Sequence, residues 1–201
     1  MVAIIDYDAG NIRSVEKAIV SLGYEAVVTR DADTILAAEH VILPGVGAFG
    51  DAMNKLSAYG LVDVIRAVAN RQIPFLGICL GLQLMFESSE EAPGVEGIGL
   101  LKGSIVRIPE KDDLKIPHIG WNSLQYPGQG RLFAGIPQDS YVYFVHSYYL
   151  QAQDKEIVKA VTEYGIEIHA SVEKGNLFAC QFHPEKSSDV GMKILHNFMQ
   201  I

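Results

Sequence analysis

The chain has 201 residues and a formal net charge of −8, so we expect neither nucleic acid nor an anionic membrane as a partner. Its two cysteines, Cys79 and Cys180, are too few for a disulfide framework and favour a reducing compartment. The N-terminal residues lack a basic segment with a long apolar run, so we expect a cytoplasmic protein without a signal peptide.

Short apolar runs alternate with helical patterns in the first half of the chain. The runs that predict buried strands are residues 2–5, 26–28, 41–43 and 74–78. The segments that predict helices are residues 12–22, 48–58, 61–70 and 80–87. Asn11 lies where the N-cap of the first helix is expected. This alternation favours a parallel sheet with helices on both faces.

The pattern changes after about residue 103. Segments that predict strands, separated by Gly, Pro and Asp, are residues 104–108, 118–125, 141–149, 157–164, 168–173 and 177–182. A last helix is predicted at residues 190–199. There is no internal repeat or linker, so we predict one domain over residues 1–201. It should be a three-layer α/β fold whose central sheet is mostly parallel, with an antiparallel extension.

The segment Gly77-Ile-Cys-Leu-Gly81 follows a predicted buried strand and opens a predicted helix. Glycines two residues before and two after Cys79 suit a sharp turn that exposes a nucleophile. The positive end of the helix dipole would favour the thiolate, which is the reactive form. The alternative is a buried cysteine that acts as a small hydrophobic residue.

The segment Phe182-His-Pro-Glu185 ends the last predicted strand. Residues two apart on a strand share a face, so Glu185 could orient the imidazole of His183. The carboxyl ends of the two strands could bring Cys79 and His183 together at the ligand-binding edge of the sheet. By itself, such a segment more often carries only a surface histidine and glutamate at the end of a strand.

A third segment, Pro44-Gly-Val-Gly47, also follows a predicted strand. Its backbone N–H groups, together with that of Leu80, could stabilise an oxyanion. A plain strand-to-helix turn is the alternative. The sequence shows no phosphate-binding loop, and no site for a metal or an organic cofactor.

With these segments, the chain resembles the class I glutamine amidotransferases. Gly77-Ile-Cys-Leu-Gly-Leu-Gln83 and Phe182-His-Pro-Glu185 are diagnostic of that family. The resemblance implies a flavodoxin-like fold and hydrolysis of glutamine to glutamate and ammonia. Cys79 would form a thioester, His183 would carry protons and Glu185 would orient His183. The residues expected around the oxyanion are Val46, Gly47 and Leu80.

The resemblance also implies substrate-binding residues. Gln83 lies one helical turn after Cys79 and can face the same pocket. Glu91 would meet the ammonium group of glutamine, and the segment His146-Ser147-Tyr148 would hold its carboxylate through backbone groups. Without the resemblance, Gln83 and Glu91 would be interpreted as solvated surface residues.

Within the family, the chain is most similar to the glutaminase subunits of histidine biosynthesis. The matching stretches are residues 6–11, 44–50, 83–91, 117–122, 143–148 and 183–187. They imply a heterodimer with a (β/α)8-barrel cyclase, where ammonia meets a phosphorylated ribosyl-aminoimidazole intermediate. Asn11, Trp121, Tyr143 and Lys186 would lie at the interface or gate. Such glutaminases typically need the liganded partner for activity, and a flexible 44–47 loop would suit this control.

Three alternatives remain open from the residues. The chain could serve another synthase, such as that of pyridoxal phosphate or anthranilate synthesis. It could be a binding module that kept the fold without activity. It could also be a cysteine hydrolase of the same architecture that acts on peptides or thioesters.

Overall fold

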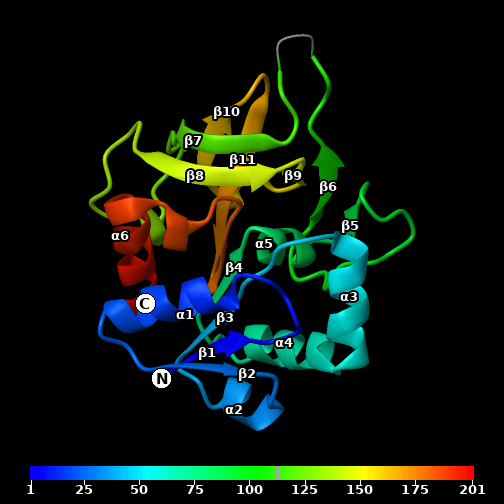
Figure 1. Ribbon diagram of the computed structural model, residues 1–201, viewed down its shortest axis with the longest axis vertical. Helices are drawn as coiled ribbons and strands as arrows, with labels where there is room; N and C mark the ends of the chain where they lie inside the picture. Colours follow the sequence, from blue (N-terminus) through cyan, green and yellow to red (C-terminus); the bar gives the residue numbers. More distant parts are fainter. Residues whose placement is uncertain (112–113) are drawn as a thin grey trace.

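The structure is a computed structural model that describes residues 1–111 and 114–201. Its strands are β1 (Val2–Ile5), β2 (Ala26–Thr29), β3 (His40–Leu43), β4 (Phe75–Ile78), β5 (Ser88–Ser89), β6 (Gly103–Arg107), β7 (His118–Ser123), β8 (Tyr141–His146), β9 (Tyr148–Ala152), β10 (Val158–Glu163), β11 (Glu167–Lys174) and β12 (Leu177–Cys180). Figure 1 shows how these strands are arranged, with β7 and β8 lying across the upper part of the molecule.

The α-helices are α1 (Ile12–Ser21), α2 (Ala32–Leu36), α3 (Phe49–Ala58), α4 (Leu61–Asn70), α5 (Leu80–Leu84) and α6 (Ser188–Met199). Short 3₁₀ helices are η1 (Arg131–Phe133), η2 (Lys155–Ile157) and η3 (Pro184–Lys186). Among the residues that the structure describes, no helix has both the length and the apolar character needed to cross a membrane.

The central sheet has the strand order β10-β11-β12-β4-β3-β1-β2. The five strands from β12 to β2 are parallel, whereas β10 and β11 add to the sheet in antiparallel pairing. The described part of the chain also contains two smaller sheets, with the strand orders β5-β6-β9 and β7-β8. The predicted mostly parallel sheet with an antiparallel extension is therefore confirmed.

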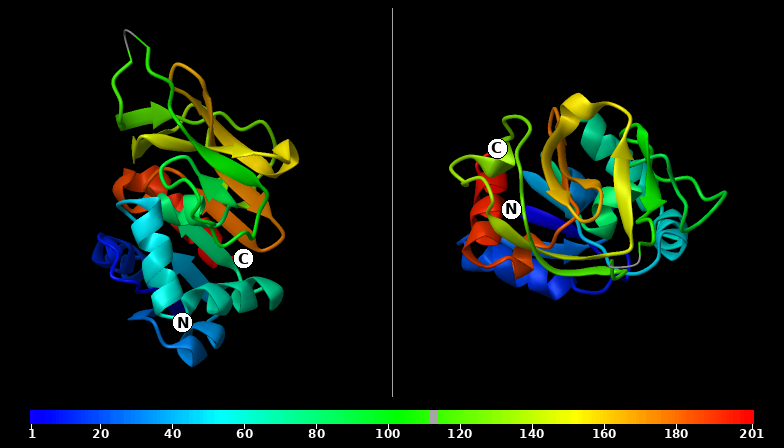
Figure 2. Two further views of the ribbon diagram at one scale, coloured as in Figure 1. Left: turned by 90° about the vertical axis from the view of Figure 1, so that its right-hand side faces the viewer. Right: turned by 90° about the horizontal axis from the view of Figure 1, so that it is seen from above.

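Both faces of the parallel sheet are buried under helices. Along β1, Val2 and Ile4 pack on one face, and Ala3 and Ile5 pack on the other, as alternation along a strand requires. Helices α1 and α6 cover the first face and helices α2 to α5 cover the second. Figure 2 shows the helical layers below the strands β6 to β9 in its left view. Coverage of both faces explains why these strands read as continuous apolar runs.

The predicted helix at residues 80–87 is too long. Helix α5 ends at Leu84, because the loop after it takes the carbonyls that a longer helix would use. The N–H of Ile98 donates to the Leu84 carbonyl at 2.8 Å, and those of Leu100 and Leu101 donate to the Met85 carbonyl. The short helix α2 and the two-residue strand β5 are not predicted.

The predicted strand at residues 141–149 is two strands in different sheets. Strand β8 ends at His146 and pairs with β7, whereas β9 begins at Tyr148 and pairs with β6. Ser147 lies between them, and its carbonyl accepts the N–H of Ile108. The other predicted elements agree with the structure to within two residues at each end.

Candidate active site

Cys79 lies on a sharp turn between β4 and α5, with φ 55° and ψ −109°. Close approach of backbone explains the two flanking glycines. A Cβ on Gly77 would lie 2.7 Å from the Gly81 carbonyl oxygen, and a Cβ on Gly81 would lie 1.9 Å from that of Leu43. Only glycine fits at both positions, so the backbone around Cys79 is held in a conformation that few cysteines adopt.

The side chains of His183 and Glu185 are both buried, and His183 Nδ1 lies 2.8 Å from Glu185 Oε1. The sequence predicts that they share one face of a strand, but this is wrong. Strand β12 ends at Cys180, and the 3₁₀ turn η3 folds Glu185 back onto the imidazole ring. Because the carboxylate accepts, Nδ1 donates and Nε2 is left without a partner among the described residues.

The environment of His183 favours its charged form. Burial lowers the pKa of His183, but the nearby Cys79 and the hydrogen-bonded, negatively charged Glu185 outweigh this and raise it to about 9. The neighbouring Cys180 is fully buried, and burial raises the pKa of its thiol. Cys79 is therefore the cysteine with a base beside it, as a nucleophile requires.

Cys79 and His183 face one cavity of about 340 Å³ at the carboxyl ends of β4 and β12. This is the edge at which open α/β sheets bind ligands. The residues that line the cavity are Val46, Gly47, Cys79, Leu80, Gln83, Glu91, Pro117, Val145, His146, Ser147, Tyr148 and His183. Ten of these lining residues were predicted from the sequence as the nucleophile, the base, or oxyanion or substrate residues. The remaining predicted catalytic residue, Glu185, lies behind His183.

The predicted substrate residues differ in what they can offer. Glu91 lines the cavity, and one of its oxygens accepts the N–H of Phe49 at 2.8 Å. His146 has no free ring nitrogen, because Nδ1 bonds to the Tyr148 carbonyl and Nε2 bonds to His118. Contact between this segment and a substrate would thus have to come from its backbone.

The predicted oxyanion donors are not all free. The N–H of Leu80 donates to the Gly45 carbonyl at 3.3 Å, so the protein itself occupies this donor. Gly47 has φ 101°, a conformation that favours glycine. The buried hydroxyl of Tyr7 donates to the Pro44 carbonyl at 2.9 Å and holds the start of this loop.

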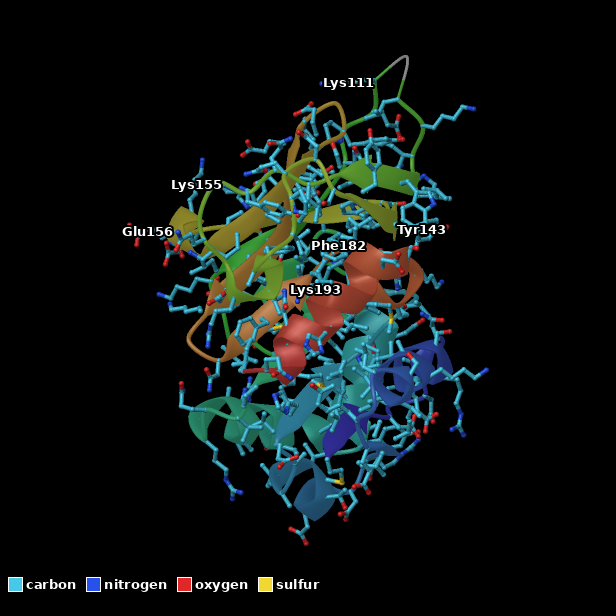
Figure 3. The ribbon with its side chains drawn as sticks, turned by 90° about the vertical axis from the view of Figure 1, so that its left-hand side faces the viewer. Lys111, Tyr143, Lys155, Glu156, Phe182 and Lys193 are labelled. Carbon is cyan, nitrogen blue, oxygen red and sulfur yellow. The ribbon has the colours of Figure 1, made fainter. Side chains whose placement is uncertain are left out.

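The four predicted interface residues are not among those that line the cavity: Lys186 is part of η3, Asn11 precedes α1, and Trp121 and Tyr143 lie on β7 and β8. Trp121 and Tyr143 are paired across β7 and β8, with ring centroids 6.2 Å apart, and Lys186 Nζ lies 6.0 Å from the Tyr143 ring. Figure 3 shows Tyr143 at the edge of the molecule, whereas the buried Phe182 lies nearer its centre. Their role at an interface stays a prediction.

Asn11 occupies the N-cap position of α1, but its side chain makes no capping hydrogen bond. Instead, Asn11 Nδ2 donates to Glu185 Oε1 at 2.6 Å. The same oxygen therefore accepts from Asn11 and from His183. A capping motif could not reveal this contact, because it joins residues 174 positions apart in the sequence.

Sequence reasoning missed Gln181, which is fully buried two residues before His183. Its Nε2 lies 3.7 Å from Cys79 Sγ, and its Oε1 lies 3.1 Å from Gln83 Nε2. Pro117 and Val145 were also missed as cavity residues. A polar residue inside an otherwise apolar strand run was the available signal for Gln181.

Known proteins match this chain over almost its whole length. The family described as "Glutamine amidotransferase class-I" matches residues 3–201. A protein of Moorella thermoacetica, named "Imidazole glycerol phosphate synthase subunit HisH", is 53% identical over 200 residues, covering 100% of this chain and 94% of that protein. A protein of the same name from Methanocaldococcus jannaschii is 46% identical over 201 residues and 100% of both chains.

The fold is shared with solved structures as well. A crystal structure described as a glutamine amidotransferase has a TM-score of 0.78 and 19% identity, covering 100% of this chain and 98% of that one. The likeness at this identity concerns the fold, whereas the match of residues 3–201 concerns the family. The chain belongs to the class I glutamine amidotransferases.

Proposed function

We propose that this chain is the glutaminase subunit of an imidazole glycerol phosphate synthase and hydrolyses glutamine to glutamate and ammonia. The observation that carries the proposal is the placement of Cys79 and His183 on one cavity, with Glu185 bonded to the far nitrogen of His183. Such an arrangement of nucleophile, base and orienting carboxylate supports acyl transfer through a covalent intermediate.

In the first step, Cys79 Sγ passes its proton to His183 Nε2, and the sulfur attacks the carboxamide carbon of glutamine. Glu185 holds the Nδ1–H, so the imidazole presents Nε2 to the reacting atoms. The amide nitrogen leaves as ammonia with the proton from Nε2, and a thioester remains on Cys79. Water, deprotonated by His183, then attacks the thioester, so that glutamate leaves and the sulfur is restored.

The cavity supports an amino acid as substrate. Its volume of about 340 Å³ is at the small end of ligand pockets. We assign Glu91 to the substrate ammonium group and the 146–148 backbone to its carboxylate. Glu91 supports this role because it is a carboxylate at the cavity wall whose position is fixed by the Phe49 N–H.

The occupied Leu80 N–H supports control of the reaction by a partner. An oxyanion needs a free donor, and here the Gly45 carbonyl takes it. Rotation of the peptides between Pro44 and Gly47 would release the Leu80 N–H and expose that of Gly47. Glycine makes such rotation inexpensive. Locking the loop in one orientation should therefore abolish stimulation by the partner.

We assign a (β/α)8-barrel cyclase as that partner, to which ammonia passes for the synthesis of imidazole glycerol phosphate in histidine biosynthesis. The names of the two relatives describe a subunit of the synthase, which supports a multi-subunit enzyme. Trp121 and Ile119 are 52% and 59% exposed on one face of β7, an apolar surface that suits a protein interface. The cytoplasm is the expected location, since its reducing conditions would keep Cys79 a thiol.

The test is glutamate release from glutamine by the purified chain, alone and with a barrel cyclase and its nucleotide ligand. We expect strong stimulation by the liganded cyclase, and none with Cys79→Ala. Glutamate release that is unchanged by the cyclase would support the glutaminase activity but reject this partner. Activity on peptides or thioesters but not on glutamine would favour a different cysteine hydrolase. Absence of any activity would favour a binding module.

A further inference from the structure

The backbone carbonyl of Tyr148 accepts two side-chain hydrogen bonds at the cavity wall. His146 Nδ1 lies 2.8 Å from this oxygen, and Gln83 Nε2 lies 3.1 Å from it. A carbonyl oxygen can only accept, so both nitrogens must carry a hydrogen. The carbonyl therefore determines which atoms donate and which accept in two hydrogen-bonded series of side chains, one that begins at Gln83 and one that begins at His146.

The first series leads to the nucleophile. Because Gln83 Nε2 is a donor, the Gln181 atom 3.1 Å from it must be the amide oxygen. The Gln181 amide nitrogen then lies on the other side, 3.7 Å from Cys79 Sγ, with a hydrogen to donate. Reversing the Gln181 amide would set two buried N–H groups against each other, which is unfavourable in a low-dielectric interior.

The second series keeps the carbonyl in place. His146 Nε2 is left as an acceptor and takes the Nδ1–H of His118 at 3.0 Å. Asn122 Nδ2 lies 3.4 Å from the other nitrogen of His118. Burial lowers the pKa of His118 to about 4 and that of His146 to about 3, so both rings are neutral near pH 7.

From this geometry we infer that Gln181 is a further catalytic residue, whose Nε2–H donates to the sulfur of Cys79 when it is a thiolate. The neutral thiol has its own acceptor, the Val145 carbonyl, 4.0 Å from Sγ. The thiolate has no hydrogen to give and gains most from a fixed donor, since hydrogen bonds to ions are the stronger ones. Gln181 thus stabilises the thiolate of Cys79 relative to the neutral thiol.

In the reaction, the Cys79 proton moves to His183 Nε2, and the negative charge that forms on sulfur meets the Gln181 N–H. The bond weakens when the sulfur–carbon bond forms and returns when hydrolysis breaks that bond. Helix α5 is only five residues long, so its dipole offers the sulfur limited help. The identity of the acyl substrate rests on the proposed function, whereas the effect on the thiolate does not.

The test measures alkylation of Cys79 by iodoacetamide, with mass spectrometry to separate Cys79 from the buried Cys180. Gln181→Met removes the donor at similar volume. We expect alkylation about tenfold slower at about pH 7, which corresponds to about 1.4 kcal/mol. The difference should narrow at higher pH, where the thiolate forms without the bond. A role in packing alone would not produce this pH dependence.

Gln181→Asn is the second variant, because its shorter side chain keeps a buried amide but withdraws the N–H from the sulfur. The matched control is Asn197→Leu. Asn197 is also a buried amide and donates to two backbone carbonyls near η1, outside the cavity. We expect it to lower the melting temperature but to leave the alkylation profile of Cys79 unchanged.

Glutamate release with the liganded cyclase is measured on the same proteins. If wild-type chain releases glutamate but both Gln181 variants are alkylated at the wild-type rate, the inference is overturned and the proposed function stands. If wild-type chain releases no glutamate but the variants are alkylated slowly, the proposed function fails and the inference stands. Equal slowing by Asn197→Leu would also overturn the inference.

Discussion

Gly81→Ala should inactivate the enzyme more than it unfolds it. An alanine Cβ at this position would lie 1.9 Å from the Leu43 carbonyl oxygen and 3.0 Å from the Leu43 carbonyl carbon. The oxygen belongs to the backbone of β3, so it cannot swing aside as a flexible side chain could. The start of α5 and the end of β3 must therefore separate.

The size of the effect follows from this overlap. Real Cβ contacts are essentially absent below 3.0 Å, so the two backbones must move apart by about 1.1 Å. Overpacking of this kind costs about 1–3 kcal/mol, partly offset by about 1 kcal/mol from the helix propensity of alanine. A displacement of about 1 Å at reacting groups can cost about 100-fold in rate. We expect a modest loss of stability and about 100-fold slower glutamate release.

Two measurements are made on each variant: the free energy of unfolding from a urea titration, and the rate of glutamate release by the folded protein with the liganded cyclase. Gly50→Ala is the control, because Gly50 lies inside α3 and its Cβ would meet only the Ala92 Cβ at 3.2 Å. This variant should keep its activity. A Gly81→Ala enzyme that folds and releases glutamate within about threefold of wild type would show that the turn tolerates displacement and would refute the reasoning.

Three further predictions concern pH, the orienting carboxylate and the partner. The folded chain holds the His183 proton up to about pH 9, whereas the unfolded chain loses it near pH 6.5. The stabilisation from this proton is therefore complete below pH 6.5 and should be lost as the pH rises to 9. In urea titrations, Cys79→Ala should make the free energy of unfolding change less steeply over this pH range. Asn11→Gly removes the donor to Glu185 without strain at φ 69°; glutamate release should fall about tenfold with little change in melting temperature, and unchanged release would exclude a role for this bond. Trp121→Ala removes a half-exposed aromatic side chain and should weaken cyclase binding by about 2 kcal/mol in calorimetry, whereas an unchanged Kd would place the interface elsewhere.

Much of the fold was predictable because its signals are local. Strands such as β1 and β4 are buried on both faces and read as apolar runs between turns. The turn at Cys79 was predictable for the same reason, because both of its glycines stand within two residues of the cysteine. They are required there by close backbone contacts within the turn and with the neighbouring strand β3. The end of α5 was not, because distant residues 98–101 decide which carbonyls are left for the helix.

The contacts of Asn11 and Gln181 were not predictable from local pattern. Asn11 has the residue type and position of an N-cap, yet its amide reaches Glu185 from the other end of the chain. Gln181 lies within a strand-like run, and its orientation depends on Gln83 and Tyr148. Each of these roles depends on a partner that only the tertiary structure brings near.

The bend at Ser147 connects the wrong strand prediction with the missed residue. Residues 141–149 form one strand-like run, so the sequence predicts one strand, but pairing with different sheets turns the chain between His146 and Tyr148. A continuous strand would direct the Tyr148 carbonyl to a neighbouring strand. The bend directs it instead to Gln83 and the His146 ring, and the Gln83 contact sets the amide of Gln181 against Cys79. The irregular backbone at this point is therefore what places a donor beside the nucleophile.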